Sequence, residues 1–202
     1  MTQQATARRG ARPLAFLACA LLALFAASCS INPWHAEALS KAARMNSIEE
    51  FGRDIEPTII ATRNELVTAD TFMTYTDGDL IDSYTKNGAE CYTFHSRLFF
   101  FSDVDTDHIR DTYNKHLLPL GFELSEKCWT SNGVELVNFL WTNAEYQAVM
   151  SSTTRLGQDT GTHYRAEELP SDGSTDSPKE LIDQPGRIPD WFDPNLPPAG
   201  QG

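Results

Sequence analysis

The feature that most constrains the fold of this chain is an Asn-Gly step that occurs twice among strand-forming stretches. The first is Asn87-Gly88, and the second, Asn132-Gly133, separates residues 122–130 from residues 134–141. Asn and Gly tolerate the positive φ angles of a two-residue hairpin turn, so each step is a strong hairpin signal. The sequence therefore predicts antiparallel sheet in the middle of the chain.

Two helices are predicted, one before and one after the first hairpin. Residues 47–50, Ser-Ile-Glu-Glu, form a capping-box pattern, and apolar residues recur at helical spacing as far as Leu66. Pro57 interrupts this pattern and should kink the helix or start a second one. The other helix is expected from about Thr106 to Leu118, with Gly121 as its stop signal.

The remaining periodicity completes an α+β pattern. Additional strands are expected at residues 71–76, 98–101, 146–154 and 162–166. The order of helix, strands, helix and strands, joined by tight turns, predicts one antiparallel sheet of about five to six strands with helices on one face. This α+β domain should span residues 46–168.

The N-terminal end is typical of a secretory signal peptide. Three arginines, at positions 8, 9 and 12, precede an apolar run over residues 13–27, and small residues then lead into Cys29. The run is too short for a spanning helix and has the flanks of a cleaved signal. We therefore predict a signal peptide at residues 1–28.

Residues 26–29, Ala-Ala-Ser-Cys, resemble the lipobox of bacterial lipoproteins. This resemblance implies that Cys29 is acylated on sulfur with chains such as palmitate, so that residues 29–45 tether the domain to the extracytoplasmic face of the cell membrane. Ala26 departs from the family pattern, which usually has Leu at that position. Two alternatives stay open: ordinary cleavage before Cys29, which would release a secreted protein, and an uncleaved anchor.

Two further cysteines lie within the predicted domain. Cys91 and Cys128 form an even pair in a protein predicted to be exported, which favours one disulfide. The alternative is two buried free thiols. Without matching His or Cys partners, the pair does not predict a zinc site.

The C-terminal segment, residues 169–202, has a different composition. Seven of the 11 prolines lie between Pro170 and Pro198, mixed with Ser, Asp, Gly and Gln. Such a segment has little apolar surface of its own to bury, which predicts a largely disordered tail. Trp191 and Phe192 are the exception, and we predict that they dock on this domain rather than on another protein.

The charge of the chain argues against nucleic-acid binding. There are 28 Asp and Glu residues against 16 Lys and Arg residues, a net charge of −12, and three of those arginines lie in the predicted signal peptide. Nucleic-acid affinity depends largely on basic residues that neutralise phosphates.

No motif predicts a cofactor, a metal site or catalytic residues. Residues 103–107 open like a calcium-binding loop, with Asp at alternate positions, but His108 and Asn114 replace the Gly and Glu that such a loop needs. The acidic residues are better explained as a turn and a helix N-cap. An acid pair acting in catalysis has no sequence signature and stays open.

The chain resembles small actinobacterial-type lipoproteins of unknown function, by its lipobox-like end, its helix-first domain, the Cys91 and Cys128 pair and the Leu-Gly-Phe step at residues 120–122. We therefore expect a non-enzymatic, membrane-anchored module that binds an envelope protein or polymer. The alternative is a small envelope hydrolase that uses a pair of carboxylates.

Overall fold

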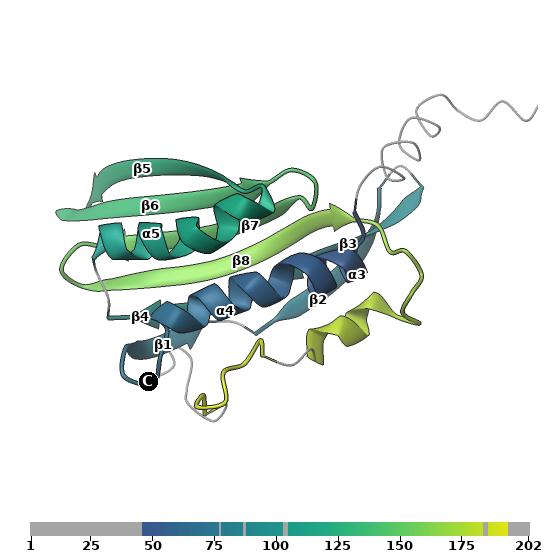
Figure 1. Cartoon of the computed structure of the whole chain (residues 1–202), viewed down its shortest axis with the longest axis horizontal. Coiled ribbons are helices and arrows are strands. Elements are labelled where there is room, and N and C mark those ends of the chain that lie inside the picture. Colours follow the sequence, from purple (N-terminus) through teal and green to yellow (C-terminus); the bar gives the residue numbers. More distant parts are fainter. Residues whose placement is uncertain (1–45, 77, 87, 103–104, 184–185, 194–202) are drawn as a thin grey trace, which may run out of the picture. The chain divides into compact units, whose positions relative to one another are not determined.

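The computed structural model describes residues 46–193 except 77, 87, 103–104 and 184–185 (Figure 1). The helical segments are α3 (Ile48–Glu50), the π-helical η1 (Phe51–Ile55), α4 (Glu56–Leu66), α5 (Thr106–Leu117), and the 3-10 turns η2 (Leu118–Leu120) and η3 (Pro178–Asp183). The strands are β1 (Phe72–Thr76), β2 (Leu80–Lys86), β3 (Ala89–His95), β4 (Leu98–Phe101), β5 (Glu123–Ser131), β6 (Val134–Asn143), β7 (Ala148–Arg155) and β8 (Asp159–Leu169).

The fold is α+β, with one antiparallel sheet as predicted, but the sheet has eight strands. Its order is β1-β4-β8-β7-β6-β5, and β3 pairs with both β2 and β8. The expected five to six strands were too few because the first hairpin is interrupted. Leu80 pairs with His95 whereas Thr76 pairs with Leu98, so the register shifts by one residue between them. This bulge divides one long hairpin into the short ribbons β1–β4 and β2–β3.

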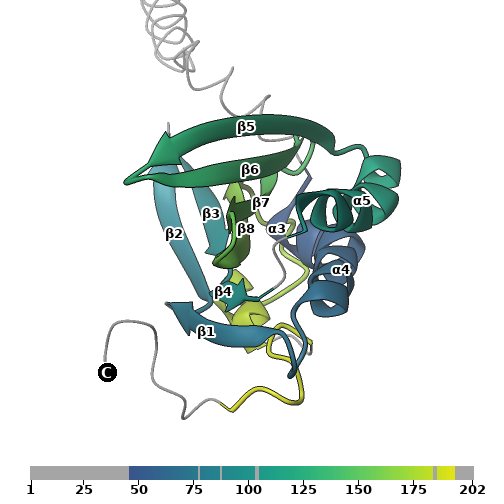
Figure 2. The same cartoon turned by 90° about the vertical axis from the view of Figure 1, so that its left-hand side faces the viewer.

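The helices lie on one side of the sheet, as predicted (Figure 2). Their buried stripes meet large aromatic residues of the strands. The ring of Phe51 packs on Phe94 with 6.2 Å between centroids, and the ring of Tyr113 packs on Trp141 at 4.8 Å. All four side chains are almost completely buried, so this interface is the hydrophobic core.

The first helix begins and changes its winding where the sequence predicts. The Ser47 hydroxyl accepts a hydrogen bond from the Glu50 amide, and the Glu50 carboxylate accepts one from the Ser47 amide, which confirms the capping box. α4 begins at Glu56 with Pro57 in its first turn, and the helical winding continues without a break from α3 through η1 into α4. Just before Pro57, the Glu56 amide donates to the Phe51 carbonyl five residues back, the spacing of a π-helix. This wider turn adapts the chain to the missing proline N–H.

Local turn signals were also accurate. Asn132 and Gly133 have φ angles of 50° and 80°, as a two-residue hairpin turn requires, and they join β5 to β6. The second predicted helix is α5, whose N-terminus is capped by Asp105. Gly121, with a φ angle of 81°, then turns the chain into β5.

The predicted disulfide between Cys91 and Cys128 is wrong, because both thiols are free. Through the pairing of β5, β6, β7 and β8, Cys128 lies level with Thr160. Tyr92, which follows Cys91, pairs with Leu169 at the other end of β8. About nine residues of β8 at about 3.3 Å each separate these levels by about 30 Å, whereas a disulfide needs Cα atoms within about 7 Å. Cys91 is buried and Cys128 is exposed.

The segment after Glu168 differs from the predicted disordered tail. The described residues run on to Asp193, and Phe192 is only 6% exposed. Its ring lies 5.0 Å from that of Tyr75 and 5.8 Å from that of Phe99, so the prediction that this pair docks on its own domain is confirmed for Phe192. Trp191 packs on Phe72 but stays 37% exposed. The predicted signal peptide, Cys29 and tether lie outside the described residues.

A buried ion pair holds this segment to the first helix. The Arg187 guanidinium donates from Nε to Glu56 Oε1 at 2.6 Å and from Nη2 to Glu56 Oε2 at 2.7 Å. The Tyr164 hydroxyl donates to the same carboxylate at 2.7 Å, and Arg63 donates to the Arg187 carbonyl at 2.8 Å. Glu56 has no exposed surface and Arg187 is 3% exposed. A buried carboxylate is tolerated only with such partners, so α4 and the C-terminal segment depend on each other.

Arg187→Leu should lower the free energy of unfolding by about 3–5 kcal/mol, because it leaves the Glu56 carboxylate buried without its counterion. In a Glu56→Gln background the same substitution should cost clearly less, since a neutral amide needs no counterion. Urea denaturation of the four proteins measures both differences. An equal cost in the two backgrounds would show that the ion pair does not hold the segment.

Candidate functional site

The sheet has two unlike faces. Alternate residues of a strand point to opposite sides. In β8, Thr162 and Tyr164 are buried beneath the helices, and the Thr162 hydroxyl lies 2.9 Å from the Tyr113 hydroxyl of α5. By this alternation Gly161 and His163 lie on the other side of the sheet, opposite α4 and α5 (Figure 2), and we call this side the open face.

The first hollow of the open face, the Leu136 hollow, has a volume of about 310 Å³. Its lining comes from β4, β6, β7 and β8 and comprises Leu98, Phe100, Leu136, Thr153, Arg155, Asp159, Gly161 and His163. The floor depends on Gly161, since a Cβ there would come within 3.0 Å of the Phe100 ring. At one end, Arg155 and Asp159 form an ion pair across the β7–β8 turn, so their charges are neutralised and the remaining lining is largely uncharged.

The second hollow, the His95 hollow, adjoins the first and has a volume of about 340 Å³. It is lined by Gly78, Leu80, His95, Ser96, Leu98 and His163, so the two hollows share Leu98 and His163. Ser96 lies at the bulge between β3 and β4, where its hydroxyl accepts a hydrogen bond from the Tyr164 amide at 2.8 Å. The bulge therefore shapes the wall of this hollow. Leu80 is 48% exposed at its rim.

His163 is the polar group common to both hollows. Burial lowers the pKa of His163 below its ordinary value, and the charges of Arg165 and His95 lower it further. The imidazole is thereby kept neutral at neutral pH. It offers one donor and one acceptor to a ligand rather than a positive charge.

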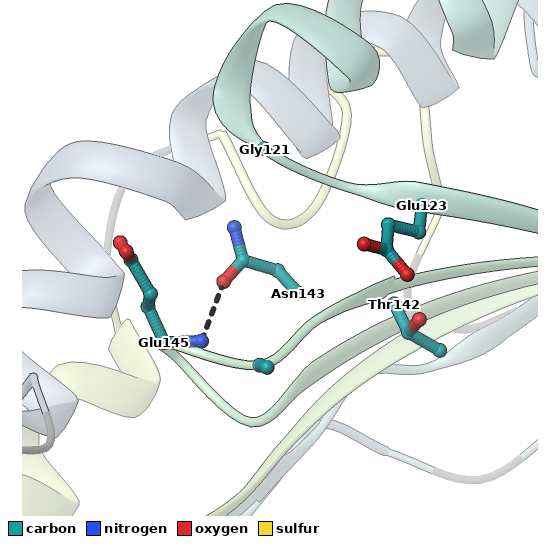
Figure 3. A pocket seen from close by; sticks show the side chains of 6 residues that line it. Gly121, Glu123, Thr142, Asn143 and Glu145 are labelled. Carbon is teal, nitrogen blue, oxygen red and sulfur yellow. Dashed lines mark hydrogen bonds between the residues drawn. The ribbon is translucent and has the colours of Figure 1, made fainter.

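A third hollow, the Asn143 hollow, lies at the end of the sheet where α5 passes into β5 (Figure 3). It has a volume of about 210 Å³, and Glu123 and Glu145 lie on either side of Asn143. The Asn143 amide is committed to the fold, because it donates to the Leu120 carbonyl and accepts from the Glu145 amide. The carboxylates of Glu123 and Glu145 are the charged groups in the lining of this hollow.

The sequence-predicted site residues do not gather in one place. Cys91 and Cys128 are on separate strands, Trp191 and Phe192 lie against β1, and Cys29 is outside the described residues. Among the described residues, no three His, Cys, Asp or Glu side chains are grouped to hold a metal ion. Sequence reasoning missed His163 and Gly161 as a site. The alternation of residues 159–165 was the available signal, since it places both on one face.

Within the described ranges, no helix has the length and hydropathy needed to cross a membrane. The fold is an α+β domain that carries two adjoining hollows on the open face of a single sheet. A model of the DUF4853 family, described as a domain of unknown function, matches residues 44–177. The chain belongs to this family.

A solved structure shares the fold. It is the crystal structure of a DUF4853 family protein from Actinomyces odontolyticus, with 12% sequence identity and a TM-score of 0.50. The likeness covers 67% of this chain and 76% of that chain. None of the curated proteins compared matches this sequence. The expected resemblance to actinobacterial proteins is thus shown at the level of the family, and the lipoprotein signal stays a prediction.

His163 should make the protein less stable as the pH falls below about 6.5, the ordinary histidine value. Because the folded pKa is lowered, the unfolded chain binds this proton more readily, so folding loses free energy through that range. Between about pH 7.5 and pH 5.5, the free energy of unfolding of the His163→Gln variant should fall less than that of the wild-type protein. Urea denaturation measures the difference. If the free energy of unfolding changed with pH equally in the two proteins, the lowered pKa of His163 would be contradicted.

Proposed function

We propose that this chain is a lipid-anchored, non-enzymatic module of the cell envelope that binds an envelope protein or polymer on the open face of its sheet. The observation that carries this proposal is the pair of adjoining hollows that share Leu98 and His163. Their size and mostly apolar lining with few polar groups suit ligand binding. Because the hollows lie side by side rather than merging into one deep cavity, they suit an extended chain.

The exposed side chains beside the hollows support the same surface. Leu80 is 48% exposed at the rim of the His95 hollow. Trp129 is 37% exposed and pairs with Leu136, so it flanks the Leu136 hollow on the edge strand β5. Aromatic and aliphatic side chains of this kind provide most of the contact energy in binding sites.

The membrane anchor rests on the residues before the domain. Acylation of Cys29 would hold the domain at the extracytoplasmic face, and its acidic surface would be repelled by anionic headgroups. The acyl chains would then supply the membrane attachment. Secretion without an anchor is the alternative.

Intact-mass measurement of the protein isolated from membranes of its own host should give a chain that begins at Cys29 and carries acyl groups. Cys29→Ser should release the protein into the soluble fraction. An unmodified N-terminus on the wild-type chain would overturn the lipid anchor and leave the secreted alternative.

Photo-crosslinking tests the binding surface. A photoreactive residue at Leu80 should crosslink an envelope protein or polymer in native cells. The matched control is Leu118, which is 46% exposed but follows α5, away from the open face. Equal crosslinking at both positions would mean that the open face is not the binding surface.

A small envelope hydrolase is the second candidate. Glu123 and Glu145 line the same hollow, which supports a carboxylate pair (Figure 3). Hydrolysis of an envelope polymer by the wild-type protein, abolished in Glu145→Gln, would favour this candidate over the binding module.

A further inference from the structure

Among the strands that the structure describes, β5 is an open edge of the sheet. It is last in the strand order, and eight of its nine residues are exposed. It lies at the margin of the sheet in both views (Figures 1 and 2). Its register with β6 is unbroken from Glu123 to Ser131, so it has no bulge, and it contains no proline. Bulges and prolines, two of the means by which proteins block a sheet edge, are therefore absent from β5, and the charges that it carries are Glu123, Glu126 and Lys127.

The direction of the backbone groups follows from the hairpin. A two-residue turn closes with a hydrogen-bonded pair, here Ser131 and Val134, and antiparallel pairs then alternate along the ladder. Every second residue, Ser131 included, directs its N–H and C=O toward β6. The others direct these groups outward, namely Leu124, Glu126, Cys128 and Thr130. A ladder of this kind is complementary to another extended strand.

We propose that β5 pairs antiparallel with β5 of a second copy of this chain, with Cys128 at the two-fold axis. This interface goes beyond the proposed function and does not rest on it. The strand itself supplies the argument for a copy as the partner, because its charges disfavour two of the three longest self-pairing registers and leave the third. Centred on Lys127, the pairing would place two lysines opposite each other, and centred on Glu126 it would oppose two glutamates.

Centring the pairing on Cys128 avoids both repulsions. Residues 125–131 of the two chains then pair, and each Lys127 lies opposite the partner's Trp129. The Lys127 amine lies 5.6 Å from the Trp129 ring centroid within one chain, and this register would bring the partner's Trp129 beside the same amine as a second aromatic face. Glu126 lies opposite the partner's Thr130, a neutral residue. This is the longest self-pairing of β5 without like charges directly opposed.

The exposed Cys128 thiol makes this register testable. In a hydrogen-bonded antiparallel pair the two Cα atoms lie about 5.5 Å apart, which is inside the range of about 4.4–6.8 Å that a disulfide spans. Oxidised glutathione is the reagent: two protein thiols and one glutathione disulfide yield one interchain disulfide and two glutathione thiols. Desolvation and the Glu126 carboxylate raise the Cys128 pKa, so the reaction is run at mildly alkaline pH.

The purified full chain should form a dimer with oxidised glutathione, seen on non-reducing electrophoresis and cleaved by reductant. Cys128→Ser should remain a dimer by sedimentation without a covalent link, because backbone pairing and not the thiol holds it. Glu126→Pro removes an outward N–H without touching the ladder to β6, and should give a folded monomer. Cys128→Lys would place two lysines opposite each other at the two-fold axis, and this variant should also be a folded monomer.

The register has its own control. In the Cys128→Ser background, Thr130→Cys alone should not crosslink, whereas Glu126→Cys and Thr130→Cys together should, since these positions face each other. Crosslinking by Thr130→Cys alone as efficiently as through Cys128 would show random collision. A monomeric Cys128→Ser protein in sedimentation, with native circular dichroism, would overturn the proposal.

Discussion

The contact between Glu56 and Arg187 is the constraint on which the rest of the fold depends. The two residues are 131 positions apart, yet the carboxylate and the guanidinium meet in a bidentate pair with almost no exposed surface. A lone buried carboxylate would cost several kcal/mol, so α4 can pack on the sheet with Glu56 inward only when Arg187 is in place. The Arg187 guanidinium also covers the Phe94 ring at 4.4 Å. The ion pair is therefore built into the aromatic core, and helix, sheet and C-terminal segment form as one unit.

Local signals in the sequence were reliable because short-range geometry decides them. The capping box at Ser47, the hairpin at Asn132 and the stop at Gly121 each depend on a few neighbouring dihedral angles. The errors concern partners that are distant in sequence. Composition describes how little residues 169–202 can bury among themselves, but Phe192 buries its ring against strands formed a hundred residues earlier. The disulfide prediction failed similarly, since counting thiols carries no information about strand order. His163 and Gly161 became a site only once β4 and β7 were placed on either side of β8.

The family match adds a second view of the C-terminal segment. It ends at residue 177, before Arg187 and Phe192, although both complete the core of this chain. The buried charge of Glu56 is thus neutralised by a residue outside the matched region. The Actinomyces odontolyticus structure, at 12% identity, shows that the helix-on-sheet arrangement survives almost complete replacement of side chains. Packing against an antiparallel sheet needs the right pattern of apolar residues more than particular ones.

The open face and the open edge meet at Trp129, which links the two proposals physically. Its side chain lies beside the Leu136 hollow, and its strand is the one that would pair with a second copy. Antiparallel neighbours in a sheet place paired side chains on the same face, so the open faces of two copies would be continuous across the dyad. An extended polymer could then contact the hollows of both chains, and the second contact would be intramolecular. Binding would gain effective concentration without any new side-chain contact. The hollows of two paired chains would bind a long ligand far better than the hollows of one chain alone.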